Sequence, residues 1–311
     1  MKKWLAGGSA CPTLTKNVGQ ALSPANSRRG ETEMNTVAIF GVGLIGGSFA
    51  LALRRTGFSG RIIGVSSPET IRKAVELGVI DEGMSAEQAA RAADLIYLAQ
   101  PILRIVEILP QLDPWVRPDA LVTDAGSTKS TIVERAGAIT RCQFLGGHPM
   151  AGREKRGVEA AEAGLFRGRP YVLTPHTEAG LQTPQVRDFL AWIGKMGAIP
   201  VILSPAGHDQ IVAFTSHLPQ LASTGLAALL EGRAEPKSGV FGPALLDSTR
   251  LALSSFDIWG DILATNRDSI RTALRSYIAQ LEEFYLGLDA GPMEEQFRRA
   301  AKFASQLRNS S

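Results

Sequence analysis

Cysteine is scarce in this sequence. Only Cys11 and Cys142 occur among the 311 residues, and neither stands in a CxxC or other metal-type spacing. So few cysteines exclude a disulfide framework and are typical of a reducing compartment, so we expect a cytoplasmic protein. There are only four histidines, and no cluster of His, Cys, Asp and Glu in the sequence predicts a metal site.

Long apolar runs and concentrated charge are also missing. No stretch of about 20 apolar residues exists, so we expect no membrane-spanning helix. The formal net charge is +3, and the 33 basic residues are spread along the chain rather than gathered in a stripe with interleaved aromatic residues. This distribution argues against nucleic acid as a partner, whereas a mildly basic surface suits a small anionic molecule.

The first 33 residues lack hydrophobic periodicity and are rich in Ser, Gly, Thr and Pro. Their basic opening is followed by an apolar segment that is too short for a signal peptide. We therefore expect residues 1–33 to form a disordered extension. The folded sequence is expected to begin at Met34, which is a candidate natural start of translation.

From Thr36 onward, short apolar runs alternate with segments of helical periodicity. Strands are predicted at 36–41, 61–66, 94–100, 120–126, 143–147, 171–175 and 198–204. Helices are predicted between them, among others at 44–56, 68–77 and 184–196. Buried strands that alternate with helices predict a parallel sheet with crossover connections.

Strand signals stop after about Ser204. The stretch 205–231 has the pattern of a long helix, which Pro219 should kink or divide. Further helical segments are predicted at 244–255, 258–264, 266–287 and 292–308. The second half of the chain, residues 205–311, is therefore predicted to be an all-helical domain.

A glycine motif follows the first strand and opens the first helix, with the sequence Gly41-Val42-Gly43-Leu44-Ile45-Gly46. Gly41 suits a tight turn, Gly43 lets the backbone approach a pyrophosphate, and Gly46 lets the helix pack closely on its strand. A glycine-rich turn without a ligand is the alternative, but the position between strand and helix favours a dinucleotide. We therefore predict a Rossmann domain, residues 34–204, whose cofactor contacts include Gly41, Gly43, Leu44, Ile45 and Gly46.

The end of the second strand bears on the choice between NAD and NADP. An NAD-specific site usually carries Asp or Glu there, whereas this chain has Ser66 and Ser67. These serines, with Arg72, can bind a 2′-phosphate that no carboxylate repels. The alternative is that Glu69 reaches the ribose. The sequence therefore favours NADP, or the use of both cofactors.

Two motifs stand at the ends of later strands, where a parallel sheet faces its ligand crevice. The first runs from Asp124 through Ser127 to Lys129; here Asp124 can be a helix cap and Ser127 a turn residue. The second is GGHPMAG at 146–152. Its two glycines let the backbone pass close to a flat group, and Pro149 fixes the exit, so His148 is predicted to be catalytic rather than structural.

Taken together, these motifs resemble the prephenate dehydrogenase family, which includes arogenate dehydrogenases. The resemblance covers about residues 35–300 and is carried by GVGLIGGS, DAGSTK, GGHPMAG, SHLP at 216–219 and the run from Asp247 to Arg250. It implies oxidation and decarboxylation of prephenate to 4-hydroxyphenylpyruvate with a nicotinamide cofactor, on the route to tyrosine. The less favoured alternatives are arogenate as substrate, a β-hydroxyacid dehydrogenase and a non-catalytic cofactor sensor.

The resemblance also implies roles for single residues. His148 accepts the hydrogen bond of the substrate's C4 hydroxyl, with Ser127 beside it, and Arg250 holds the ring carboxylate. His217, Glu154 and Trp259 contact or close the substrate pocket. Arg250 can instead pair with Asp247 on the surface, and His217 can satisfy a carbonyl freed by the kink.

Two positions depart from the family pattern, and the assembly is also predicted. Relatives often carry a small polar residue where Arg153 stands and a basic residue where Leu246 stands. The sequence therefore does not decide which residues hold the three-carbon side chain of the substrate. The helical segments 220–230 and 270–287 are more apolar than a small domain can bury against itself. With the resemblance, this predicts a homodimer formed by the helical domain.

Overall fold

The computed structural model describes residues 34–309 except 154, 234–238 and 291–292, so the predicted extension at 1–33 lies outside the described residues. One eight-stranded sheet has the order β3-β2-β1-β4-β5-β6-β7-β8. Its strands are β1 (Thr36–Phe40), β2 (Arg61–Val65), β3 (Glu82–Gly83), β4 (Leu95–Leu98), β5 (Leu121–Asp124), β6 (Gln143–Pro149), β7 (Pro170–Thr174) and β8 (Ile199–Ile202).

Helices connect the first six strands, which are all parallel. They are α1 (Leu44–Arg55), α2 (Pro68–Glu76), α3 (Ala86–Ala92), α4 (Ile102–Leu112) and α5 (Ser130–Ala136), and α6 (Pro184–Lys195) joins β7 to β8. The strand order and the glycine turn after β1 are those of a Rossmann-like domain, as predicted.

The last two strands differ from the all-parallel prediction. β7 runs antiparallel to β6, and β8 is parallel to β7. The reason is the connection 150–169, in which the only regular element among the described residues is a short 3₁₀ turn at Val158–Ala160. Without a crossover helix, the chain re-enters the sheet from the edge at which it left. This loop therefore stays at the carboxyl edge of the sheet, where ligands bind.

Two apolar cores lie on the two faces of the sheet, because successive strand residues point to opposite sides. Val37 and Ile39 face the core beneath α1, α2 and α6, whereas Ala38 and Phe40 face the core beneath α3, α4 and α5. Residues from the C-terminal helices, including Ile262, join the second core. The helical half is therefore packed against the α4 and α5 side of the sheet.

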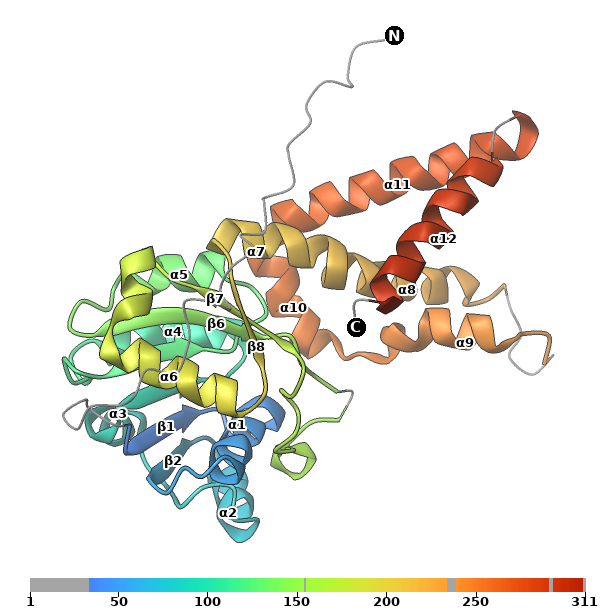
Figure 1. Cartoon of the computed structure of the whole chain (residues 1–311). Coiled ribbons are helices and arrows are strands. Elements are labelled where there is room, and N and C mark those ends of the chain that lie inside the picture. Colours follow the sequence, from blue (N-terminus) through green and yellow to red (C-terminus); the bar gives the residue numbers. More distant parts are fainter. Residues whose placement is uncertain (1–33, 154, 234–238, 291–292, 310–311) are drawn as a thin grey trace.

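From Pro205 onward the described chain is helical. Its elements are α7 (Pro205–Val212), α8 (Leu218–Leu230), α9 (Pro243–Thr249), α10 (Phe256–Thr265), α11 (Arg267–Ala290) and α12 (Met293–Asn309). In Figure 1, α8, α9, α11 and α12 project away from the sheet. In the described part of the chain, no helix is both long and apolar enough to cross a membrane. The domain boundary at 204/205 stays a prediction.

The predicted long helix at 205–231 is divided, as Pro219 suggested. A π-helical segment, Ala213–His217, separates α7 from α8, and Pro219 lies in the first turn of α8, where its missing N–H costs nothing. Single π turns inside helices are frequent at functional sites. Here the wide turn ends on His217.

Candidate active site

The glycine motif borders a cavity at the carboxyl edge of the sheet. Gly41 has a φ of +92°, and a Cβ there would lie 2.7 Å from the carbonyl oxygen of Ala99. A Cβ on Gly46 would overlap the carbonyl oxygen of Gly41. Gly43 differs, because a Cβ there would meet no atom within 4 Å. Packing thus explains Gly41 and Gly46, whereas the space beside Gly43 is left for a ligand.

This cavity has a volume of about 450 Å³ and lies where Rossmann domains bind the pyrophosphate of a dinucleotide. No side chain caps the N-terminus of α1, so the backbone N–H groups of its first residues, Leu44 and Ile45 among them, are left for an anion. At the end of β4, Oε1 of Gln100 is buried and has no hydrogen-bond partner among the described residues. An uncapped helix end and an unpaired acceptor suit a pyrophosphate and a sugar hydroxyl.

At the end of β2 the cavity is bordered by Ser66, Ser67 and Thr70. The hydroxyl of Ser67 caps α2 and lies 2.9 Å from that of Thr70. Arg72 and Glu69 do not border the cavity; they pair on the surface of α2 with Glu76 and Lys73, respectively. Among the described lining residues, this end of the cavity carries hydroxyls and no carboxylate.

The loop between β6 and β7 covers the same edge. Gly157 borders the cofactor cavity. Beyond it, Glu159 pairs with Lys73 of α2 at 2.9 Å, and the N–H of Glu162 donates to Ser48 of α1 at 2.8 Å. On the other side, Arg156 reaches Asp257 of α10 at 3.4 Å. The loop therefore connects the cofactor cavity with the helical half.

A buried ion pair holds the strand that carries His148. Nζ of Lys129 binds the carboxylate of Asp124, and both side chains are fully buried. Nζ also donates to the carbonyl oxygen of Gly147 at 2.6 Å, and the N–H of Gly147 donates to Asp124 Oδ1 at 3.0 Å. The two charged side chains thus bind the backbone of Gly147 beyond the last residues that pair β5 with β6. Asp124 is therefore not a cap of α5.

The glycines before His148 have a different role from the one predicted. A Cβ on Gly146 would overlap the hydroxyl of Thr174, and one on Gly147 would lie 2.5 Å from the carbonyl oxygen of Asp124. Both glycines are therefore required by close contacts between neighbouring strands. They do not serve to admit a flat ligand.

His148 lies at the carboxyl end of β6 and is about nine-tenths buried. Its Nδ1 is 2.8 Å from Nε2 of His208, and Nδ1 of His208 is 2.8 Å from Oδ1 of Asp209. Nε2 of His148 makes no hydrogen bond within the described part of the chain. Burial, followed by the nearby His208, Lys129 and His217, holds the pKa of His148 well below its usual value. His148 is therefore a neutral group with one free ring nitrogen.

His217 approaches from the helical half. Its Nδ1 is 3.3 Å from Nδ2 of Asn266, and the indole of Trp259 meets its ring edge-on at a centroid distance of 5.8 Å. Burial lowers the pKa of His217 to about 4, with His208 adding to the effect and Asp209 opposing it. The structure thus brings together His148, His217 and Trp259, all predicted from the sequence.

The other predicted site residues are less enclosed. Ser127 is half-buried in the turn after β5, next to the strand of His148. Arg250 is exposed at the start of a 3₁₀ segment, Arg250–Leu253, which Gln220 and Ser223 of α8 hold through hydrogen bonds to its backbone. Glu154 lies outside the described residues.

Sequence reasoning missed His208, Asp209 and Asn266. His208 and Asp209 are buried on α7, and Asn266 is buried where α10 ends. No local motif marks them. The one available signal was the histidine count, because three of only four histidines in the chain are buried in this cluster.

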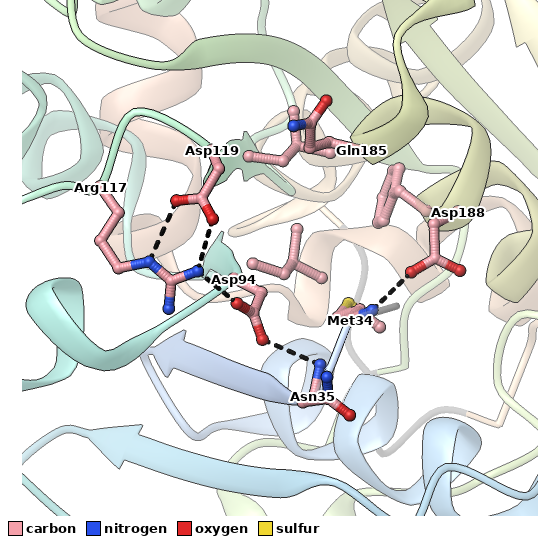
Figure 2. Close-up of a pocket in the computed structure, with 10 residues that line it drawn as sticks. Met34, Asn35, Asp94, Arg117, Asp119, Gln185 and Asp188 are labelled. Carbon is pink, nitrogen blue, oxygen red and sulfur yellow. Dashed lines mark hydrogen bonds and ion pairs between the residues drawn. The ribbon is translucent and has the colours of Figure 1, made fainter. Parts of the chain in front are cut away.

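A second pocket lies at the opposite edge of the sheet, where β1, β4 and β5 begin (Figure 2). Its polar groups are used to hold the chain. Asp94 accepts the N–H groups of Asn35 and Thr36 at 2.8 Å, and Arg117 pairs with Asp94 and Asp119. Ligands of parallel sheets bind at the other edge, so this pocket is structural.

Comparison with known proteins agrees with this geometry. Residues 49–198 match the family model "Prephenate dehydrogenase, nucleotide-binding domain", and residues 204–303 match "Prephenate dehydrogenase, dimerization domain". The chain is 33% identical over 277 residues to a prephenate dehydrogenase of Bacillus subtilis, which covers 85% of this chain and 73% of the relative.

Two solved structures are also similar. One is prephenate dehydrogenase from A. aeolicus in complex with hydroxyphenyl propionate and NAD+, with a TM-score of 0.78, 31% identity, and coverage of 90% of this chain and 98% of the other. The second is Synechocystis arogenate dehydrogenase, with a TM-score of 0.71, 30% identity and coverage of 88% and 98%.

Proposed function

The chain belongs to the prephenate dehydrogenase family, and from this premise we propose that it oxidatively decarboxylates prephenate to 4-hydroxyphenylpyruvate in tyrosine biosynthesis. One observation carries the proposal. A buried, neutral His148 with a free Nε2 stands at the same sheet edge as the cavity bordered by the dinucleotide-binding glycine motif.

The reaction needs a hydrogen-bond acceptor at the C4 hydroxyl of the substrate. A nicotinamide dinucleotide held at the glycine motif would supply the hydride acceptor for C4. Nε2 of His148 takes the hydroxyl proton as hydride leaves C4, and the electron pair of the bond between C1 and its carboxylate enters the ring as CO2 leaves. The proton then returns from His148 to the C4 oxygen, which gives the phenol of the product. Burial of His148 helps here, because an uncharged imidazole keeps its lone pair available at neutral pH.

Substrate binding is assigned to residues around this histidine. From the resemblance, Ser127 in the turn after β5 is assigned to the position beside His148, and Arg250 anchors the ring carboxylate with its permanently charged guanidinium. His217 and Trp259, whose rings are in contact in the helical half, are assigned to the substrate pocket. Glu154 lies outside the described residues and is assigned a closing role from the resemblance alone.

We propose that NADP is accepted at least as well as NAD. The support is the hydroxyl lining formed by Ser66, Ser67 and Thr70, where no described carboxylate repels a 2′-phosphate. Arg72 adds no support, because it does not border the cavity and lies 3.7 Å from Glu76 on the surface of α2. The preference therefore depends on hydroxyls rather than on a basic side chain.

Arogenate is the second candidate substrate, because an arogenate dehydrogenase is among the similar structures. The two substrates differ at the side chain, where Arg153 departs from the family pattern. Arg153 is paired with Glu162 within the covering loop, which leaves its charge partly neutralised. A β-hydroxyacid dehydrogenase would need a catalytic lysine in the helical domain. This alternative is disfavoured, because the only lysine in the described helical half is Lys302, which is exposed on α12.

We propose that the protein is a homodimer assembled through the helical half. No residue of α12 is buried, and Phe297 and Phe303 are 67% and 61% exposed. On α11, Tyr285 and Leu286 are 74% and 69% exposed. Aromatic and aliphatic side chains in such numbers on two neighbouring helices are typical of an interface.

Steady-state rates at the absorbance band of the reduced nicotinamide test the proposed function. NAD and NADP are each combined with prephenate and with arogenate, and hydroxyisobutyrate serves as the control substrate. We expect turnover with prephenate, and a kcat/KM with NADP at least equal to that with NAD. Absence of turnover with both cyclohexadienyl substrates would overturn the assignment.

A further inference from the structure

Asp209 lies at the meeting point of two hydrogen-bond chains that lead to the two site histidines. Its side chain leads through His208 to His148, and its backbone carbonyl leads through Asn266 to His217. We propose that Asp209, His208 and Asn266 are positioning residues that fix opposite tautomers, so that Nε2 of His148 is an acceptor and Nε2 of His217 is a donor. The catalytic consequence rests on the proposed function, whereas the proton positions follow from the contacts alone.

The first chain begins with a carboxylate that can only accept. Asp209 takes hydrogen bonds from the backbone N–H groups of Lys129 and Ser130 at 2.7 and 2.8 Å. Its contact with Nδ1 of His208 therefore places a proton on that nitrogen. In the neutral ring Nε2 of His208 is then a bare acceptor, and Nδ1 of His148 must donate to it. The remaining nitrogen of His148, Nε2, keeps its lone pair.

The second chain begins with a carbonyl oxygen, which also can only accept. Nδ2 of Asn266 lies 2.8 Å from the carbonyl oxygen of Asp209, and only the amide nitrogen can make that contact. The same nitrogen faces Nδ1 of His217 at 3.3 Å. Because an amide nitrogen donates, Nδ1 of His217 is the acceptor, and its ring proton resides on Nε2.

Both rings are neutral, which makes the tautomer the decisive property. Burial lowers the pKa of His148 and of His217, and burial also lowers the pKa of His208 although its hydrogen bond to Asp209 acts in the opposite direction. The carboxyl of Asp209 keeps a lowered pKa despite burial, because His208 and two backbone N–H groups donate to it. The hydrogen-bond chain that leads to His148 therefore begins with a charged acceptor, the carboxylate of Asp209, at neutral pH.

The two tautomers suit two different parts of the proposed substrate. An acceptor at His148 receives the proton of the C4 hydroxyl, and Nδ1–H remains bonded to His208 while positive charge develops. A donor at His217 suits a carboxylate or carbonyl oxygen of the substrate. With exchanged tautomers, His148 would present an N–H to a hydroxyl that must lose its proton.

Nitrogen-15 NMR of histidine-labelled, ligand-free protein measures the tautomers directly. The chain has four histidines, so single substitutions assign each ring, and the exposed His176 supplies the unconstrained reference. We expect the wild-type protein to show Nδ1–H for His148 and His208, and Nε2–H for His217. The opposite tautomer at His148 or His217 would overturn the proposal, whether or not any variant folds.

One leucine variant tests each of the two hydrogen-bond chains, and a glutamine variant tests rescue of the first. His208→Leu removes the acceptor, so the tautomer of His148 should become averaged while that of His217 is unchanged. Asn266→Leu should have the reverse effect. His208→Gln retains an oxygen acceptor and should restore the Nδ1–H form. An unchanged His148 tautomer in folded His208→Leu would contradict the proposal.

Kinetics with prephenate then test the consequence. His208→Leu should lower kcat about 10²-fold with KM within a few-fold of wild type, because a wrongly placed proton disables the acceptor. His208→Gln should recover most of the loss, and equal loss in both variants would contradict a tautomer role. Absence of activity in the wild-type protein would instead overturn the proposed function and leave the NMR result standing.

Discussion

The ammonium group of Lys129 donates a 2.6 Å hydrogen bond to the carbonyl oxygen of Gly147, the residue that precedes His148. The strand end that carries the catalytic candidate is thus held by β7 on one side and, beyond the last residue paired with β5, by this side chain on the other. Lys129 is fully buried, and within the described residues its ammonium group forms an ion pair with Asp124 alone. Because the Lys129–Asp124 pair is buried, the position of the carboxyl end of β6 depends on both partners being present.

Lys129→Met should therefore destabilise the protein strongly. The substitution leaves the carboxylate of Asp124 buried without its partner, and breaking a buried pair in this way costs about 3–5 kcal/mol. Urea unfolding measures the loss. Arg135→Met, at an exposed position of α5, is the control and should change stability by less than about 0.5 kcal/mol. A loss as small as the control's would show that the pair does not hold the strand.

Two alanine substitutions should separate cofactor binding from folding. Gly43→Ala places a methyl group in open space, so thermal stability should be nearly unchanged while the Kd for the cofactor rises at least about tenfold, because the methyl group occupies ligand space. Gly46→Ala places it against the carbonyl oxygen of Gly41 and should lower Tm. Calorimetry of unfolding and of binding reads both effects. Normal cofactor affinity in Gly43→Ala would show that the cofactor does not occupy the space beside Gly43.

Acid should destabilise the protein through its buried histidines. The pKa of His217 is about 4 in the folded protein against 6.5 as the usual value. Below pH 6.5 the unfolded chain binds a proton that the folded chain excludes, so stability is complete above pH 6.5 and is lost as the pH falls toward 4. For this residue, a change from pH 7.5 to 5.5 costs about 1 kcal/mol.

Urea midpoints at the two pH values check this expectation. The pKa values of His148 and His208 are also lowered, so they add to the loss in the same direction. His217→Asn should reduce the pH dependence, whereas His176→Asn, at an exposed position, should leave it unchanged. Equal midpoints at both pH values in the wild-type protein would contradict the buried neutral state.

The helical half should give a dimer in solution. Light scattering after size exclusion should report a mass near twice the 33.2 kDa of one chain. Leu286→Glu should shift the mass toward one chain, because a charge would have to be buried at the interface. Val75→Glu, on the equally helical but distant α2, is the control. A wild-type mass of one chain with full activity at nanomolar concentration would refute the dimer.

Much of the fold was predictable because its signals are local. Apolar β-branched runs such as Thr36–Phe40 are buried strands, and Pro68 begins a helix. Gly41 and Gly46 were also read correctly, since a tight turn and a close helix contact need glycine wherever they occur. The direction of β7 was not predictable in this way, because it depends on whether residues 150–169 form a crossover helix.

The active-site residues show the same difference between local signals, which the sequence reveals, and contacts between distant segments, which it does not. His148 stood out because a glycine pair and a proline surround it at a strand end. His208 did not, because it is 60 residues away in sequence and joins His148 only when α7 docks on the sheet. Lys129 lay in a recognised motif, yet its burial with Asp124 follows from the pairing of β5 with β6, which a local pattern does not encode.

The central claim is that His148 accepts the proton of the substrate hydroxyl. The kcat of His148→Asn with prephenate, measured beside the wild-type protein at saturating cofactor, tests it most directly. The account predicts a fall of about 10²–10⁴-fold with the cofactor Kd unchanged, since the carboxamide fills the position but is a poor base. A kcat near the wild-type value would contradict the account.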